Sequence, residues 1–269
     1  MIFHDAYARP TPFELVFPDP ADGAALMTAA REEAERLGVD AANPQSFVML
    51  GSVATYLQRV QAPDAPATAV HQYGALLFHA AHHAGAGLRT YLVESHVARY
   101  LVDGAPPGDG VELPGDAGYV QLPRNLFWVR PHPDAPAEPV DGYHWTLGSG
   151  GYLHCLLALG MRGDRPGLVV VPVPEAPWAE AETWLHAQVR EDSRDFETTL
   201  PGGELEGLLS LETAGEVLKL TSRLFRYLQV HAAAVVAEEP RTHGPEELPH
   251  SGLSYSRVTL DDAPTRESL

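Results

Sequence analysis

The chain has 269 residues and an apolar fraction of 45%, which excludes a disordered protein and allows one large domain or two small ones. It carries 36 acidic and 18 basic residues, so its net charge is -18. A surface this acidic repels nucleic acid and anionic membranes, and we expect neither as a partner. A basic protein or a cationic ligand would be favoured, although acidity also serves solubility alone.

The single cysteine and the N-terminal residues indicate the cellular compartment. Cys155 is the only cysteine, which excludes an internal disulfide and a thiolate zinc cluster, and its apolar neighbours predict a buried thiol. The first residues show no basic region followed by an apolar one, so we expect no signal peptide. No apolar run approaches the roughly 20 residues of a membrane span. These features predict a cytoplasmic protein.

The first hundred residues read as helical after a proline-rich arm, in which Phe13–Phe17 suggests one strand. Asn43 followed by Pro44 is a typical helix start, because the side chain caps the first turn and proline fits within it. Gly38 and Gly85 each end a run with helical periodicity. We predict helices at residues 22–37, 44–61, 68–85 and 88–102.

The stretch from residue 118 to 174 consists of short apolar runs separated by Gly, Pro and Asp, which predicts an antiparallel β-meander. A proline-rich insertion at residues 131–140 should form a surface loop. Beyond the meander, Pro177 should open an amphipathic helix. The capping box Thr213-x-x-Glu216 should open a longer helix that ends near Ala237.

The fold class predicted from this pattern is α+β, with a helical N-terminal half packed on a central, mostly antiparallel meander of four to six strands. We place one domain at residues 1–237 and a flexible acidic and proline-rich tail at residues 238–269. Within that domain we expect three parts: a helical part at about 20–103, the meander at about 117–174 and C-terminal helices at about 176–237. Lys219, Arg223 and Arg226 should form a basic stripe on the last helix, against which the tail could fold back.

A histidine pair suggests a metal site. His79 and His83 are four residues apart on a predicted helix, the spacing at which two imidazoles can share an ion. Glu94 or His96 on the next helix could supply a third ligand. A divalent metal is the one cofactor this pattern supports, and otherwise none is expected. The alternative is a polar helix face with solvated imidazoles.

The predicted helix at residues 88–102 has one face dense in polar side chains. We take Glu94 and His96 as catalytic candidates, because a carboxylate and an imidazole can perform acid–base chemistry near neutral pH. Arg89 and Arg99 on the same helix are candidates for binding an anionic ligand. The alternative is a salt-bridged surface helix, and Arg99 has Asp103 four residues on.

The meander holds most of the aromatic residues. If Trp128, Tyr143, Trp145 and Tyr152 share one sheet face, they form an aromatic surface suited to a protein or a small molecule. We therefore take Trp128, Tyr143, His144 and His154 as ligand-binding candidates. The alternative is that these side chains form the core.

Two functions remain open from sequence. The first is a binding or protein-interaction module that uses the aromatic sheet face and the acidic surface. Its partner would be a protein, with a basic one favoured, or a small molecule. The second is a small-molecule or metal-dependent enzyme with a His/Glu site on the helices at residues 71–102. Walker A, GxGxxG and GxSxG motifs are all absent, and this absence favours the first.

Overall fold

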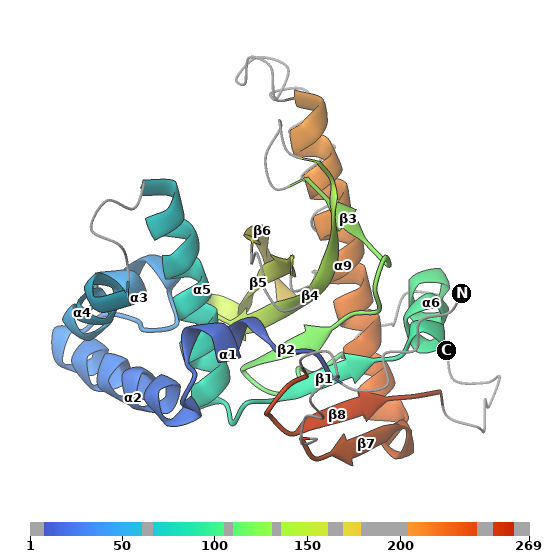
Figure 1. Cartoon of the computed structure of the whole chain (residues 1–269), viewed down its shortest axis with the longest axis horizontal. Coiled ribbons are helices and arrows are strands. Elements are labelled where there is room, and N and C mark those ends of the chain that lie inside the picture. The colour runs from blue at the N-terminus through green and yellow to red at the C-terminus, as the bar shows by residue number, and fades with distance from the viewer. Residues whose placement is uncertain are drawn as a thin grey trace.

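The computed structural model describes residues 8–60, 67–104, 110–130, 136–160, 169–178, 204–240 and 250–260. One mixed sheet lies between two helical layers (Figure 1). The N-terminal helices cover one face, and α6 and α9 cover the other. The predicted α+β class is confirmed. Within this part of the chain, no helix is both long and apolar enough to cross a membrane.

The first helical layer comprises α1 (Pro12–Val16), α2 (Pro20–Leu37), α3 (Pro44–Met49), α4 (Gly51–Val60) and α5 (Ala67–Gly85). The strand expected at Phe13–Phe17 is wrong, because α1 occupies it. Asn43 caps α3 as expected, with its side chain accepting from the amide of Ser46 at 2.9 Å. The predicted helix at 44–61 breaks at Leu50, whose ψ of 139° is extended. Glu33 then caps α4 by accepting from the amides of Gly51 and Ser52.

The sheet strands are β1 (Thr90–Val93), β2 (Ala117–Gln121), β3 (Trp128–Val129), β4 (Glu138–Leu147), β5 (Tyr152–Leu159), β6 (Val169–Pro177), β7 (Val235–Glu238) and β8 (Tyr255–Val258). Their order is β6-β5-β4-β2-β1-β8-β7, and β3 pairs with β4. The segment from β2 to β6 is the predicted antiparallel meander, with β3 as a side branch. By contrast, β1 runs parallel to both β2 and β8.

The second helical layer contains α6 (Ser95–Asp103) and α9 (Glu204–Val230), and short 3-10 turns lie at η1 (Ser149–Gly151) and η3 (Ala232–Ala234). The single helix predicted at 88–102 is wrong for residues 90–93, which form β1. This strand is buried along its whole length. An apolar run of four residues is compatible with both a helix and a strand, so the sequence pattern does not distinguish them. Pro177 ends β6 instead of opening a helix, and residues 179–203 lie outside the described part.

The tail predicted at residues 238–269 is in part a folded segment. Residues 255–258 form β8, which is inserted between β1 and β7 and contributes Val258 and Tyr255 to the interior. Pairing with two neighbouring strands attaches this segment to the sheet although its apolar content is low. Residues 241–249 and 261–269 lie outside the described part.

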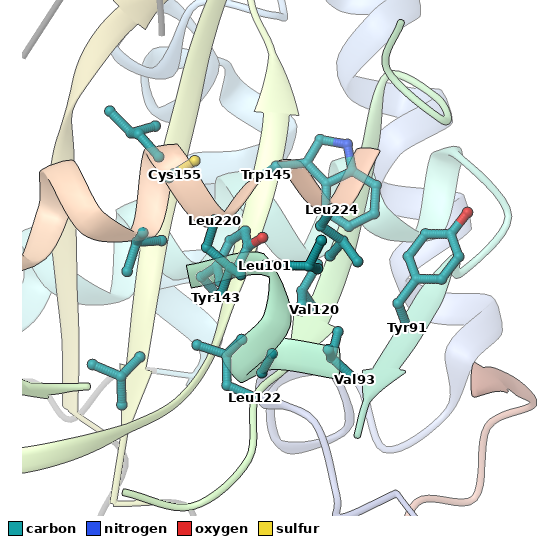
Figure 2. Close-up of a cluster of buried hydrophobic side chains, with 14 of the residues drawn as sticks. Tyr91, Val93, Leu101, Val120, Leu122, Tyr143, Trp145, Cys155, Leu220 and Leu224 are labelled. Carbon is teal, nitrogen blue, oxygen red and sulfur yellow. The ribbon is translucent and has the colours of Figure 1, made fainter. Parts of the chain in front are cut away.

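The larger core fills the space between the sheet and the second helical layer (Figure 2). Tyr143 and Trp145 of β4 point into it and meet Leu220 and Leu224 of α9. Gly118 on the neighbouring strand leaves room for the indole of Trp145, because a Cβ there would collide with it. The thiol of Cys155 is buried in this core, and burial raises its pKa to about 12. The prediction of a buried cysteine is confirmed.

Two residues of the predicted basic stripe on α9, Arg223 and Lys219, make contacts within the fold. Arg223 is buried and donates through Nη1 to the carbonyls of Leu101 and Val102, at 3.0 and 2.8 Å, so it caps the C-terminus of α6. Lys219 pairs with Glu216 at 2.7 Å. Both cations are thus engaged within the fold.

Candidate functional site

Three histidines from two elements meet between α5 and the sheet. His79 and His83 lie on one face of α5, and His144 of β4 points toward them from the sheet face opposite Tyr143. The ring centroid of His144 lies 5.4 Å from that of His83 and 6.1 Å from that of His79. All three side chains are buried. We call this set (His79, His83, His144) the histidine layer.

Hydrogen bonds fix only part of the histidine layer. His79 Nδ1 lies 2.9 Å from Oγ1 of Thr146, and His83 Nε2 donates to the carbonyl of Arg89 at 3.1 Å. Among the described residues, Nδ1 of His83 and both ring nitrogens of His144 have no hydrogen-bond partner of good geometry. A buried imidazole with neither nitrogen bonded is costly and calls for a physical explanation.

Burial sets the charge of the histidine layer. It lowers the pKa of His83 to about 4, although hydrogen bonds to the backbone of Arg89 and Leu88 act in the opposite direction. Burial lowers the pKa of His79 and His144 well below the usual value, and neighbouring histidines lower it further. The backbone of Gly118 offsets this slightly for His144. The layer is therefore neutral near pH 7.

The metal prediction concerns His79 and His83. The structure places both on the face of α5 that meets the sheet, as their spacing requires. Glu94 and His96 lie in a different polar cluster and do not join them. Across the described ranges, no group of three or more His, Cys, Asp or Glu side chains is arranged to hold a metal ion. Metal binding by this pair stays a prediction.

Glu94 and His96 come together at the carboxyl end of β1. Glu94 precedes α6 at the N-cap position but makes no side-chain capping hydrogen bond. Its Oε2 lies 3.1 Å from Nε2 of His96, and its Oε1 lies 3.6 Å from Nη1 of Arg257 on β8. Arg257 also pairs with Glu238, which accepts from the Tyr255 hydroxyl at 2.6 Å. Hydrogen bonding to Glu238 raises the pKa of Arg257, whereas burial is the main cause that raises that of Tyr255. We call these five residues the β1–β8 polar cluster.

The β1–β8 polar cluster has the elements of an acid–base pair. A carboxylate held by arginine orients an imidazole whose ring is partly exposed, so its other nitrogen can exchange a proton with a solute. The chemistry needs a substrate site beside the ring. Among the described residues, the polar side chains of this cluster chiefly contact one another.

The ligand-binding candidates do not form one site. Tyr143 is buried against α9, while its neighbour His144 faces α5. Trp128 is half-exposed on β3, and His154 lies 3.6 Å from Glu175 through Nδ1. The remaining two ligand-binding candidates are arginines. Arg99 is exposed on α6, and the guanidinium of Arg89 lies over Gly115.

A groove that was not predicted from the sequence lies between the C-terminal end of α2 and α3. Its volume is about 310 Å³. Exposure is 81% for Met49, 52% for Leu37 and 44% for Val39, whereas Leu50 forms a buried floor. Gln45 and Ser46 complete the lining. A signal was present in sequence: the apolar stripe of the predicted helix at 44–61 runs through Phe47, Leu50, Leu57 and Val60, and Met49 falls outside it. We call this feature the α2–α3 groove.

The chain beside the α2–α3 groove is acidic. Residues 31–40 contain four carboxylates and two guanidinium groups, and one pair of them, Arg36 with Glu33, is 3.8 Å apart. Glu35 and Asp40 are exposed and flank the two apolar residues Leu37 and Val39 in the sequence. The groove thus has an apolar lining, and the segment of sequence that contains Leu37 and Val39 is acidic.

Comparisons with known proteins identify no family. No family model matches the chain, and no curated protein matches it. A solved structure described as "Crystal structure of AcrVA2" is similar over 91% of this chain and 81% of its own, with 14% identity and a TM-score of 0.47. A likeness at this level carries no information about function.

Proposed function

We propose that the protein acts by binding a partner protein and that the α2–α3 groove is the contact surface. The observation that carries the proposal is the exposure of Met49, Leu37 and Val39 around one apolar floor. Scattered apolar side chains are normal on a surface, but neighbours that line one concave feature are typical of an interaction site. Covering them with a partner removes apolar area from water, which favours binding.

The proposal relocates the binding surface expected from sequence. Tyr143 and Trp145 pack beneath α9, so the aromatic sheet face serves as core. Trp128 and Tyr152 remain exposed and can add contacts elsewhere. The net charge of -18 supports a partner with positive charge, because complementary fields speed the encounter.

Peptide display on the immobilised full-length protein tests the proposal. The matched reagent is the double variant L37Q/M49Q, which removes apolar character without changing charge or backbone propensity greatly. We expect selection on the native protein to enrich sequences with a shared pattern, and these should lose binding to the variant. Selection that enriches nothing, or peptides that bind both proteins equally, would contradict binding at the groove.

A second candidate function is acid–base catalysis on a small molecule at Glu94 and His96. The 3.1 Å contact between them, with Arg257 on the other carboxylate oxygen, favours it. A ligand-observed NMR screen of small fragments provides the test. The candidate requires fragments that bind the native protein and not the variant E94Q/H96A; a screen without such fragments counts against it.

A further inference from the structure

We infer that Met49 is a redox modification site, at which a peroxide converts the thioether to a sulfoxide and thereby weakens binding in the α2–α3 groove. This role rests on the proposed function and adds a form of regulation to it. Three observations support it: the exposure of Met49, the burial of the other described sulfur atoms, and the place of Met49 in the wall of the groove.

Met49 carries the accessible sulfur in the described part of the chain. Three sulfur-bearing side chains lie there, and Met49 is 81% exposed, whereas Met27 is 1% and Cys155 is 2% exposed. Burial also raises the pKa of the Cys155 thiol to about 12, so the thiolate that reacts with a peroxide is scarce near pH 7. Because oxidation of sulfur follows its accessibility, dilute peroxide should modify Met49 and spare the two buried side chains.

The modification is the transfer of one oxygen atom. The Met49 sulfur attacks an oxygen of hydrogen peroxide, the O–O bond breaks, a sulfur–oxygen bond forms, and the remaining oxygen leaves as water. The sulfur loses two electrons and the peroxide gains them, so no further reactant is needed. The product is polar and chiral, and sulfoxide reductases can return it to the thioether. A reversible change of this kind can turn a binding surface off and on.

The change falls on the most exposed apolar wall of the groove. Exposure of Met49 exceeds that of Leu37 and Val39, which are 52% and 44% exposed and carry no atom that dilute peroxide oxidises. A sulfoxide places a polar oxygen where a partner would cover apolar surface, and covering a polar group without a hydrogen bond costs free energy. Oxidation should therefore weaken binding while the aliphatic wall and the floor stay unchanged.

Two hydrogen-bond donors lie beside Met49 on its own helix. Gln45 and Ser46 precede it by four and three residues in α3, so they share its helix face, and both line the groove. The Gln45 amide and the Ser46 hydroxyl can donate to a sulfoxide oxygen, whereas a thioether sulfur is a weak acceptor. These donors would hold the oxidised side chain against α3.

Peroxide treatment of the full-length protein tests the inference with two readouts. Peptide mass spectrometry measures the rates of oxidation at Met49 and Met27. Fluorescence of Nile red measures apolar binding, because this dye is neutral and the net charge of -18 does not repel it. The variants are M49L, which is apolar without sulfur, M49Q, which resembles the sulfoxide in size and polarity, and Q45A/S46A, which removes the two donors.

We expect Met49 to be oxidised about tenfold faster than Met27 or more, because close packing shields the buried sulfur. Peroxide should weaken binding of Nile red to the native protein about threefold or more, and M49Q should show a similar loss without peroxide. M49L should bind the dye equally before and after treatment. Q45A/S46A should be oxidised at Met49 as fast as the native protein but lose less dye binding.

Several results would overturn the inference. Equal rates at Met49 and Met27 would remove the selectivity, and an equal loss of dye binding in M49L and the native protein would place the effect elsewhere. An equal loss in Q45A/S46A would remove the role of the two donors. If display enriches groove-dependent peptides that bind the oxidised and native proteins equally, the proposed function stands and this inference fails. Display that enriches nothing would remove the proposed function, whatever the dye shows.

Discussion

At the scale of single residues, His144 is one of several buried polar side chains in the described core that lack a hydrogen-bond partner of good geometry. It is buried among His79, His83 and Tyr119, and neither nitrogen has a hydrogen-bond partner of good geometry within that part of the chain. Leaving a buried polar group unpaired costs about 1–3 kcal/mol. We therefore expect the histidine layer to be less stabilising than an apolar layer of the same shape.

Replacing His144 with leucine should stabilise the protein by about 1 kcal/mol, because the volume is nearly kept and the unpaired nitrogens are removed. Urea unfolding monitored by circular dichroism measures the change. His154→Leu is the control, since His154 has Glu175 as a partner and is partly exposed, so no gain is expected. A loss of stability in His144→Leu would contradict this prediction and would mean that the ring contacts of the imidazole outweigh the cost of its unpaired nitrogens.

Stability should fall as pH falls from about 6.5 to about 4. His82 and His83 have folded pKa values of about 4, below the unfolded value, because burial disfavours the charged form. The unfolded chain therefore binds more protons in this window, which draws the equilibrium toward unfolding. The stability is fully present above the unfolded pKa, and the loss levels off below the folded one. Each group contributes on the order of 3 kcal/mol at most.

The measurement is the free energy of unfolding in urea at pH 8, 7, 6 and 5. The variant His144→Leu should show a shallower slope between pH 7 and 5, because one buried histidine no longer takes up a proton on unfolding. A native curve that is flat across this interval would contradict neutral burial of the layer.

Residue spacing predicted part of the candidate sites. Positions i and i+4 place His79 and His83 on one helix face, and strand alternation separates His144 from Tyr143. Their meeting depends on how α5 packs on β4, which no local pattern contains. Glu94 and His96 were singled out together, but their partner Arg257 comes from a segment more than 150 residues further along the chain.

At the scale of elements, the helices were easier to predict than the strands at the parallel end of the sheet. Asn43 and Gly38 are local signals that mark a helix start and end, and both were correct. β1 and β8 have four residues each, too few to show a period, and they are defined by pairing with each other.

The role of β8 can be tested with two valines on adjacent strands. Val258→Asp should destabilise the protein by about 3 kcal/mol or more, because Val258 is 0% exposed and a carboxylate there would be buried without a partner. Val236→Asp, at a position 47% exposed on β7, should cost about 1 kcal/mol or less. Thermal unfolding compares them. If both variants lowered the stability by the same small amount, β8 would contribute little to the stability of the fold.

Two glycine substitutions should act in opposite directions. Gly118→Ala should destabilise by about 2–4 kcal/mol, because the new Cβ collides with the indole of Trp145 in the core. Gly74→Ala lies within α5 and meets only ordinary contact with Val48 at 3.4 Å. Alanine is the better helix former, so it should stabilise by about 0.5–1 kcal/mol. Urea midpoints of the two variants check both signs.

At the scale of the whole molecule, both ends of the described chain are fastened to the sheet. The Arg9 amide donates to Gln121 at 3.0 Å, and the Arg9 guanidinium donates to the carbonyls of Leu122 and Asp141. Glu14 accepts from Gly252 at 2.7 Å and from the hydroxyl of Ser251. The first and last described segments thus stabilise each other.

The excess of negative charge should make stability depend on salt. Self-repulsion at a net charge of -18 is screened as ionic strength rises, so the melting temperature should increase between about 0.02 and 0.3 M NaCl. Differential scanning calorimetry measures the shift. The variant E35Q/D40N should show a smaller increase, whereas a fall in melting temperature with salt would point to dominant favourable ion pairs.

The insertion of β8 has a consequence for synthesis on the ribosome. Tyr91 pairs with Ser256, so β1 emerges long before the strand that completes its pairing. At about 5–20 residues per second, this delay is roughly 10–30 seconds. During this time one edge of β1 lacks its permanent neighbour. The nascent chain therefore has an open strand edge until residues 255–258 have been synthesised, and this interval is when a chaperone or an aggregating neighbour can pair with it.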